Sequence, residues 1–459
     1  MSTEDDAIFS RHTLADASVS DSVREAWAQL LRDAHATLDR SGVPAEDRRI
    51  WIVPGRIEVL GKHVDYAGGR SLLCTVERAL VVVARPRSDG MVVLRDARRR
   101  ETVSLSIAAP QRGAIPWSVY PRTVIARLAR NFGDVITGMD VGFASNLPAA
   151  AGVSSSSALT VGLTLAMLRL SDVPRLPRWR EAITDRLALA GYIGALENGA
   201  DFASLGGERG VGTMGGAQDQ TAILCCSRGQ LDVFRWMPVQ HEQSVAWPAD
   251  HRFVVGVSGV VAAKTGAAKE RYNRAARTVH RMVQAWNRHA GESVRTLREA
   301  FVSAAGTGQP TEVPEALRAA VQAAAEPDYT ARHFDARLDQ FFDETFVLVP
   351  KAAEALRQGD LTTFGSLVDA SQFGAEHALE NQIAETVHLH RFARDLGADA
   401  ASAFGAGFGG SVWAMIPARQ AEAFMARWRE RYVRAHPVAA QRAQFFVTSP
   451  GVSAFEMIG

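Results

Sequence analysis

The sequence predicts an α/β (α+β) protein with two lobes. Its 459 residues exceed the size of one typical domain, and its composition of 47% hydrophobic and 22% charged residues is that of a folded globular protein. Strand-like segments crowd the first quarter of the chain, whereas helical patterns dominate later. We expect a flexible leader at residues 1–20, an N-terminal domain at 21–240 and a C-terminal domain at 241–459, with the boundary near residues 236–250.

The first helical pattern covers residues 22–38, where apolar positions recur at helical spacing. Short apolar segments bounded by turn residues then predict strands at 50–53, 57–60, 79–84, 91–94 and 102–107. Helical patterns follow at 119–130, 158–170 and 179–197, and then a strand at 253–257. Helices dominate residues 266–394 around a Gly/Pro loop at 306–314, before a strand at 412–416, a helix at 421–435 and a strand at 444–447.

The charges of the chain nearly cancel. The 51 Lys and Arg residues face 50 Asp and Glu residues, so the composition gives no reason to expect nucleic acid or an anionic membrane as a partner. The three cysteines, Cys74, Cys225 and Cys226, have neither disulfide-framework nor zinc spacing. The first 20 residues are polar, and no apolar segment approaches the roughly 18 residues of a membrane span. We therefore expect a cytoplasmic protein without a secretory signal.

A segment of small residues, NLPAAAGVSSSSAL at 146–159, leads directly into a helical pattern. Small residues let the backbone pass close to a ligand, and the unpaired N–H groups of a helix N-terminus suit phosphate. The serine hydroxyls can add hydrogen-bond donors or a ligand for Mg²⁺. The lysine of a Walker P-loop is absent. Taken alone, the segment is better explained as a loop whose serine caps the helix.

Two further segments are rich in glycine or in polar side chains. The segment SAFGAGFGGS at 402–411 allows a close backbone approach, although a glycine-rich turn before a strand would look the same. The segment PGRIEVLGKHVDYAGG at 54–69 carries five polar side chains on a short strand and the loop after it: Arg56, Lys62, His63, Asp65 and Tyr66. This density on a glycine-punctuated loop indicates a binding site.

In chain order, these segments resemble the motifs of the GHMP kinases and, within them, the galactokinase family. Residues 54–69 are similar to the sugar signature GR-x-NLIGEHTDYNGG, residues 146–159 to the phosphate loop and residues 402–411 to the third motif. Between them, PWSVY at 116–120 resembles the segment beside the adenine, and GGAQDQ at 215–220 resembles the catalytic segment. The resemblance implies the two-lobed GHMP kinase fold, with an active site in the cleft between the lobes. It also implies transfer of the γ-phosphoryl group of ATP to the anomeric hydroxyl of a sugar.

The resemblance assigns the catalytic carboxylate to Asp219, with Arg56 against it. A cation a few ångströms away favours the ionised carboxylate and makes it a weak base. Phosphoryl transfer is largely dissociative and needs little proton removal before the transition state. Positioning and charge stabilisation by Arg56 should then carry most of the catalysis.

The nucleotide and its Mg²⁺ are assigned to the small-residue segments. We expect the phosphates to be held by the loop before the helix at 158–170, and the third motif to pack against that loop. The residues are Gly152, Ser154, Ser155, Ser156 and Gly407. Trp117 should flank the adenine or its ribose, unless it is a buried core residue. Ser154 and Glu197 are the expected metal contacts; Glu208 is a rival, and a solvated helix-face acid is the alternative for Glu197.

The sugar is assigned to side chains that can hydrogen-bond ring hydroxyls: Lys62, His63, Asp65, Gly216 and Tyr272. Lys62 departs from the family, which carries a glutamate that accepts a hydrogen bond from the 6-hydroxyl. Lysine only donates and is cationic. One interpretation is that Lys62 swings away or donates to the hydroxyl of galactose. The other is that it pairs with a carboxylate at C6, which makes the substrate galacturonate or another uronic acid. Glu58, where the family has asparagine, is a further change.

The leading hypothesis is an ATP-dependent sugar-1-kinase, with D-galactose as its substrate and ATP and Mg²⁺ as cofactors. A uronate-1-kinase is the first alternative. A non-catalytic sugar sensor on the same fold is the second, although the phosphate loop is full length and both Arg56 and Asp219 are present. We expect a monomer whose partners are small molecules, without nucleic acid or membrane.

Overall fold

The computed structural model describes residues 8–17, 19–109, 115–260, 266–306 and 308–458. Its first half contains the helices α2 (Asp21–Asp39), α3 (Val119–Phe132), α4 (Ser155–Leu170), α5 (Pro177–Ala182), α6 (Arg186–Asn198) and α7 (Gln218–Cys225). The strands of this half are β1 (Arg11–His12), β2 (Arg49–Leu60), β3 (Arg70–Arg87), β4 (Met91–Asp96), β5 (Thr102–Ser106), β6 (Gly138–Ser145), β7 (Gln230–Arg235) and β8 (Gln240–Ala246).

The second half contains the helices α8 (Gly266–Ala290), α9 (Leu297–Ala305), α10 (Glu315–Gln322), α11 (Ala331–Phe342), α12 (Val349–Gln358), α13 (Leu361–His377), α14 (Ala384–Asp395) and α15 (Ala421–Ala435). Its strands are β9 (His251–Val257), β10 (Ala400–Phe404), β11 (Ser411–Pro417), β12 (Gln444–Thr448) and β13 (Phe455–Met457). No helix in the described ranges is long and apolar enough to cross a membrane.

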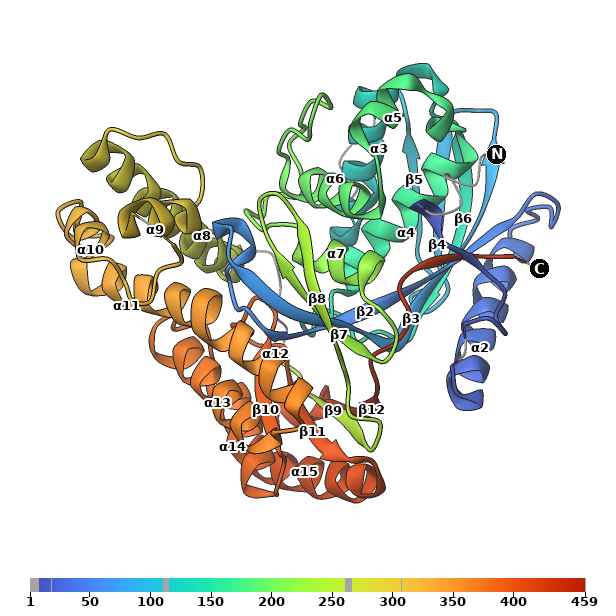
Figure 1. Ribbon diagram of the computed structural model, residues 1–459. Coiled ribbons are helices and arrows are strands. Elements are labelled where there is room, and N and C mark those ends of the chain that lie inside the picture. The colour runs from blue at the N-terminus through green and yellow to red at the C-terminus, as the bar shows by residue number, and fades with distance from the viewer. Residues whose placement is uncertain (1–7, 18, 110–114, 261–265, 307, 459) are drawn as a thin grey trace.

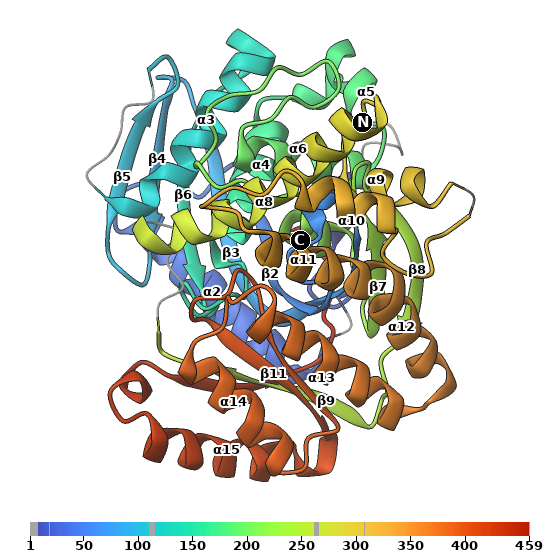
Figure 2. The same cartoon turned by 90° about the vertical axis from the view of Figure 1, so that its left-hand side faces the viewer.

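Two sheets organise the molecule. The described strands form a nine-stranded sheet, in which β13, β2, β3, β6 and β4 are neighbours, and a four-stranded sheet with the order β10-β11-β9-β12. In Figure 1, helices α3–α7 lie on one side of the large sheet, α8–α11 form an arm, and α13–α15 cover the small sheet. The turned view shows β4 and β5 at one edge of the large sheet and the small sheet with its helices below it (Figure 2). The expected two-lobed fold is confirmed.

The apolar run in β3 is buried on both faces, which is why it lacks alternation with polar residues. Val82 and Ala84 pack in the core beside α4, whereas Val81 and Val83 pack with α2 on the opposite face. Gly162 lets α4 approach the sheet closely, because a Cβ there would lie 2.9 Å from Val82. The close fit of α4 on β2 and β3 fixes where its N-terminus points.

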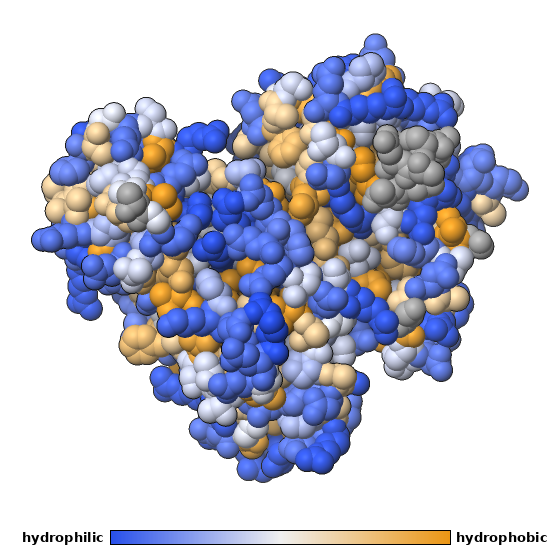
Figure 3. Space-filling view, in the orientation of Figure 1, coloured by the Kyte–Doolittle hydropathy of each residue, from blue (hydrophilic) through white to orange (hydrophobic). Residues whose placement is uncertain are grey.

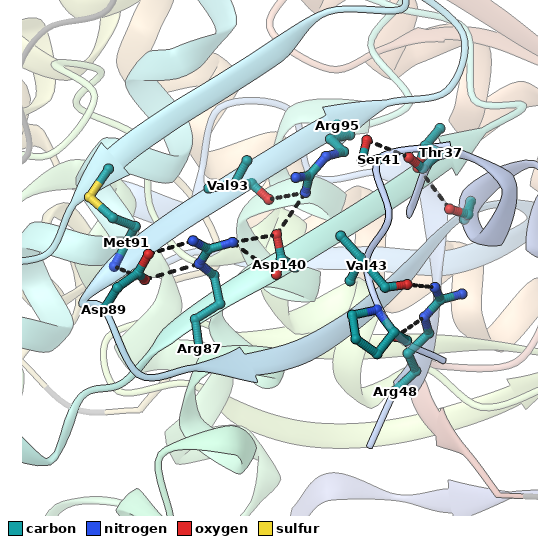
Figure 4. Close-up of polar contacts among 12 residues, drawn as sticks. Thr37, Ser41, Val43, Arg48, Arg87, Asp89, Met91, Val93, Arg95 and Asp140 are labelled. Carbon is teal, nitrogen blue, oxygen red and sulfur yellow. Dashed lines mark hydrogen bonds and ion pairs between the residues drawn. The ribbon is translucent and has the colours of Figure 1, made fainter. Parts of the chain in front are cut away.

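Two arginines, one on β3 and one on β4, form ion pairs with a single carboxylate on β6. Arg87 on β3 donates to both carboxylate oxygens of Asp140 on β6 at 3.0 Å, and Arg95 on β4 donates to Oδ1 at 2.9 Å. Figure 4 shows both guanidinium groups converging on this one carboxylate. Asp140 is buried, so two cations compensate its charge.

The N-terminal segment differs from the expected leader. Phe9 is 1% exposed and stacks on Trp179 with ring centroids 6.2 Å apart. Strand β1 pairs in parallel with β13, which itself pairs with β2. The described part of residues 8–20 is therefore held against the large sheet. Strands β1 and β13 are more than 440 positions apart, so no local sequence pattern could predict that they pair. The same pairing places β13 in the N-terminal lobe.

Candidate active site

A single cavity gathers the three sequence segments described above. It is lined from β2, the loop after it, the start of α4, α6, α7, α8 and the glycine-rich turn between β10 and β11. Of the residues expected at the site, the cavity wall includes these: Arg56, His63, Asp65, Trp117, Gly152, Ser154, Ser155, Ser156, Glu197, Gly216, Asp219 and Tyr272. Lys62 and Gly407 are not on its wall. On the face shown in Figure 3, hydrophilic side chains predominate and smaller apolar areas are scattered among them.

Arg56 and Asp219 contact each other on the cavity wall. Nε and one terminal nitrogen of Arg56 lie 2.9 and 2.7 Å from Oδ1 of Asp219. The same guanidinium donates to the carbonyl of Gly152 in the phosphate loop. Asp219 lies in the first turn of α7, where the positive end of the helix dipole favours a carboxylate. One arginine thus joins the candidate catalytic acid to the phosphate loop.

The phosphate loop turns into α4 at Ser154, which has a left-handed conformation with φ of 58°. The Oγ of Ser154 is buried and has no hydrogen-bond partner among the described residues. Gly152 also has a positive φ, 77°, which glycine adopts without strain. The N-terminal amides of α4 and this orphaned hydroxyl are groups that a phosphate or a phosphate-bound cation can satisfy.

The third motif packs on the phosphate loop. A Cβ on Gly405 would lie 3.2 Å from Cα of Gly152, and Ser411 donates a hydrogen bond to the carbonyl of Ala151. Gly407 contacts Asn381 instead, because a Cβ there would lie 2.3 Å from the Asn381 carbonyl oxygen. Gly407 therefore supports the loop from outside the cavity.

Glu197 reaches the same centre from α6. Its Oε2 accepts from Nε2 of Gln220 at 2.7 Å, and its Oε1 lies 3.5 Å from the hydroxyl of Ser157. Ser157 is also 3.2 Å from Oδ2 of Asp219. Sequence reasoning missed Ser157 as the link between these two acids; the length of the serine run was the only signal. Glu208, the rival to Glu197, is outside this cavity and lies 3.6 Å from Arg130.

The remaining wall carries groups suited to hydroxyls. Asp65 accepts from the backbone N–H of Gly216 at 3.0 Å, and a Cβ at position 216 would collide with its carboxylate. Burial raises the pKa of Asp65, and the charge of Asp219 adds to this. His63 lies 3.0 Å from the Tyr66 hydroxyl and packs near the ring of Tyr272. Burial and the Arg337 cation lower the pKa of His63 to about 4, so the imidazole is neutral near pH 7.

Comparisons with known proteins identify the family of the chain. Residues 40–86 match the galactokinase galactose-binding signature, 119–227 the N-terminal domain of GHMP kinases and 352–434 their C-terminal domain. A galactokinase from Roseiflexus sp. is 26% identical over 86% of this chain and 89% of its own length. The chain is a GHMP kinase of the galactokinase family. It is therefore a sugar kinase, a phosphotransferase.

Two other known proteins are similar to the kinase. A galacturonokinase from Arabidopsis thaliana is 25% identical over 91% of this chain and 92% of its own. The crystal structure of Lactococcus lactis galactokinase complexed with galactose superposes with a TM-score of 0.72, covering 92% of this chain and 99% of that one at 20% identity. The solved structure supports the GHMP fold.

Part of the wall of the kinase cavity is aromatic. Trp117 packs edge-on against Phe143, with ring centroids 5.5 Å apart, and its indole nitrogen donates to Glu101 at 2.7 Å. Its ring is half-buried and remains on the cavity wall. Such a surface suits the flat face of an adenine, so the expected role of Trp117 stays a prediction that the geometry allows.

Lys62 of the kinase lies in a buried polar cluster behind the cavity. It is 1% exposed, and its Nζ donates to the hydroxyl of Ser371 at 2.7 Å. Ser371 in turn donates to Oε1 of Glu344, whose Oε2 accepts from the backbone N–H of Gly61 at 2.8 Å. Burial lowers the pKa of Lys62, while Glu344 and Glu58 act in the opposite direction. Of the two interpretations of Lys62, this placement matches the one in which the side chain swings away from the sugar.

Glu58 should make the stability of the kinase depend on pH. Burial raises its pKa from 4.5 to about 7, opposed by Arg56 and Lys62 and assisted by Glu344. Between these pH values the folded state binds more protons than the unfolded state, so this carboxyl's contribution to stability is lost as pH rises through 7. We expect Glu58→Gln to remove that loss, so the melting temperature of the variant relative to wild type should rise between pH 5 and pH 8. A difference that stays constant across this range would contradict the buried placement of Glu58.

Proposed function

We propose that the kinase transfers the γ-phosphoryl group of ATP to the anomeric hydroxyl of D-galactose and so forms α-D-galactose 1-phosphate. The observation that carries the proposal is the Arg56–Asp219 pair, which stands between the phosphate loop and the hydroxyl-binding wall of one cavity. Galactose is favoured because residues 40–86 match the galactose-binding signature. The galactokinase from Roseiflexus sp. also covers most of the chain.

The arrangement divides the chemistry among a few groups. Asp219 orients the anomeric hydroxyl and takes its proton as the new O–P bond forms, because its ionised oxygens only accept hydrogen bonds. Arg56 pairs with Asp219 and offers positive charge to the γ-phosphoryl group as that group leaves ADP. The amides that open α4 bind the phosphates of ATP. Asp65 and His63 fix the sugar, so the hydroxyl and the phosphoryl group meet in one orientation.

Mg²⁺ fits the residues at the phosphate loop. The orphaned hydroxyl of Ser154 is a hard oxygen ligand, and Glu197 lies on the same cavity wall. No group of three or more His, Cys, Asp and Glu in the described ranges could hold a metal ion. This agrees with a cation held by one or two protein oxygens and the phosphates of the substrate. When bound, Mg²⁺ supplies neutralisation of the phosphate charges.

A uronate-1-kinase is the second candidate. The galacturonokinase relative covers 91% of the chain, and Lys62 replaces the family glutamate, which supports an anionic sugar. Lys62 donates to Ser371 and is not on the cavity wall, so it does not offer its charge to a sugar carboxylate there, and this favours galactose.

A coupled assay of ADP release with galactose, galacturonate, glucuronate and arabinose tests the proposed function. We expect galactose to give the highest kcat/KM. A preference for galacturonate would select the second candidate. Sugar binding measured by calorimetry without any ADP release would instead identify a non-catalytic sugar sensor.

A further inference from the structure

Glu58 is a buried glutamate on the wall of the sugar kinase cavity, and only one of its two carboxylate oxygens has a hydrogen-bond partner among the described residues. Its side chain is 3% exposed, and it is one of the residues that line the cavity. Oε2 accepts a hydrogen bond from Nε2 of Gln218. Oε1 is buried and has no partner among the residues that the structure describes. A buried carboxylate oxygen without a donor is costly, which is a reason to expect that a ligand supplies one.

The strand register of β2 and a contact with α7 together fix the direction of the Glu58 side chain. Arg56 and Glu58 alternate with Ile57 along an unbroken stretch of the β2–β3 register, so both side chains leave the same face of β2. On that face Arg56 bonds Asp219 and Glu58 bonds Gln218, two consecutive residues of α7. The amide of Gln218 is oriented in turn, because its Oε1 accepts from Ser71 at 2.9 Å.

Position 62 carries a lysine that is not on the cavity wall, whereas Glu58 places a carboxylate on it. The loop backbone at positions 62 and 63 is held by α11, where Gln340 donates to the Lys62 carbonyl at 3.0 Å and Arg337 to that of His63. With Lys62 turned onto Ser371, its ammonium group balances Glu344 behind the wall. Position 62 therefore brings no carboxylate to the wall, whereas Glu58 brings one from β2.

We propose that Glu58 determines sugar specificity by accepting, at Oε1, the hydrogen bond of the sugar's 6-hydroxyl. The inference rests on the proposed galactokinase function and names the residue that binds the substituent at C6 of the sugar. A carboxylate accepts a hydrogen bond from a hydroxyl, which can donate one. It repels the carboxylate of a uronate, because both groups are negatively charged. Burial favours the neutral form of Glu58 as pH falls, so discrimination against galacturonate weakens below pH 7.

Wild-type kinase can test the direction of this hydrogen bond without any mutation. The substrates are galactose, 6-deoxygalactose and 6-deoxy-6-fluorogalactose, because organic fluorine accepts hydrogen bonds weakly and donates none. If Glu58 accepts from the 6-hydroxyl, both analogues should lose about 10- to 100-fold in kcat/KM, and to a similar extent. If a donor such as Lys62 reads C6, the fluoro analogue should be clearly better than the deoxy analogue. That result would overturn the proposal.

The variant Glu58→Gln tests the residue itself. The glutamine oxygen can keep the bond from Gln218, which leaves an amide N–H toward the sugar. We expect galactose to lose about tenfold in kcat/KM, 6-deoxygalactose to change little, and galacturonate to improve. The matched control is Glu344→Gln, a buried glutamate of the same cluster whose two oxygens both have partners behind the wall. Its ratio of galactose to 6-deoxygalactose should equal that of wild type.

The possible outcomes separate this proposal from the function on which it rests. Equal losses by Glu58→Gln on galactose and on 6-deoxygalactose overturn the role of Glu58 and leave the galactokinase function standing. Wild-type enzyme that prefers galacturonate, or that turns over no sugar, overturns the galactokinase function and the role of Glu58 with it.

Discussion

We expect Asp219→Asn to lower kcat by about a thousandfold, within the range measured for a general base, while ATP affinity stays within about twofold of wild type. The asparagine preserves shape but has no charge to hold Arg56, and its amide nitrogen donates where the sugar hydroxyl must also donate. The carboxylate contacts Arg56 and Ser157, and the groups expected to bind the nucleotide are the α4 amides and Trp117. ADP release gives kcat, and titration with a fluorescent ATP analogue gives the affinity.

The control for Asp219→Asn is Asp140→Asn. Asp140 is also a buried aspartate held by arginines, Arg87 and Arg95, and it is outside the cavity (Figure 4). Its substitution should lower the melting temperature and leave kcat near the wild-type value. Turnover by Asp219→Asn close to that of Asp140→Asn would contradict the catalytic assignment, whatever the stability of either variant.

Local sequence patterns predicted those helices and strands that depend mainly on residues close together in the sequence. The strand at 91–94 and the helices at 119–130 and 421–435 coincide closely with β4, α3 and α15, whereas the strand expected at 79–84 covers only part of β3, which begins at Arg70. The single helix expected over residues 179–197 is instead two helices, α5 and α6. The break occurs because Asp185 caps α6 by accepting from the N–H of Ala188 at 2.7 Å. An aspartate inside a helical pattern was the available signal.

The order of the motifs along the chain predicted which segments form the site, but not the direction of every side chain in it. Arg56 and Asp219 are 163 positions apart, and only the resemblance to a family placed them together before their contact was seen. The orientation of Lys62 was not predictable, because Ser371 and Glu344 decide it from about 300 positions away. Glu208 likewise lies outside the cavity, 3.6 Å from Arg130, a contact that no motif indicates. Motifs identify the backbone of a site, whereas the direction of a long side chain depends on distant partners.

Lys62 should matter more for stability than for sugar binding. We expect Lys62→Met, which keeps most of the side-chain volume, to lower the free energy of unfolding by about 3–5 kcal/mol. The substitution removes the cation that balances Glu344 and the donor to Ser371, and it leaves buried acidic groups uncompensated. Lys62→Glu, which installs the family residue, should be worse because it adds a third carboxylate beside Glu58 and Glu344. Equilibrium unfolding in urea measures both variants.

A double variant distinguishes a charge effect from a packing effect at Lys62. If uncompensated charge causes the loss, Lys62→Met combined with Glu344→Gln should recover part of the stability lost by Lys62→Met alone. A packing defect would give losses that simply add. If Lys62 instead faced the sugar, the variants would unfold near the wild-type denaturant concentration and Lys62→Glu would change the ratio of galactose to galacturonate turnover. Because the ammonium group is buried against Ser371, the structure favours a loss of stability with the sugar preference still determined at Glu58.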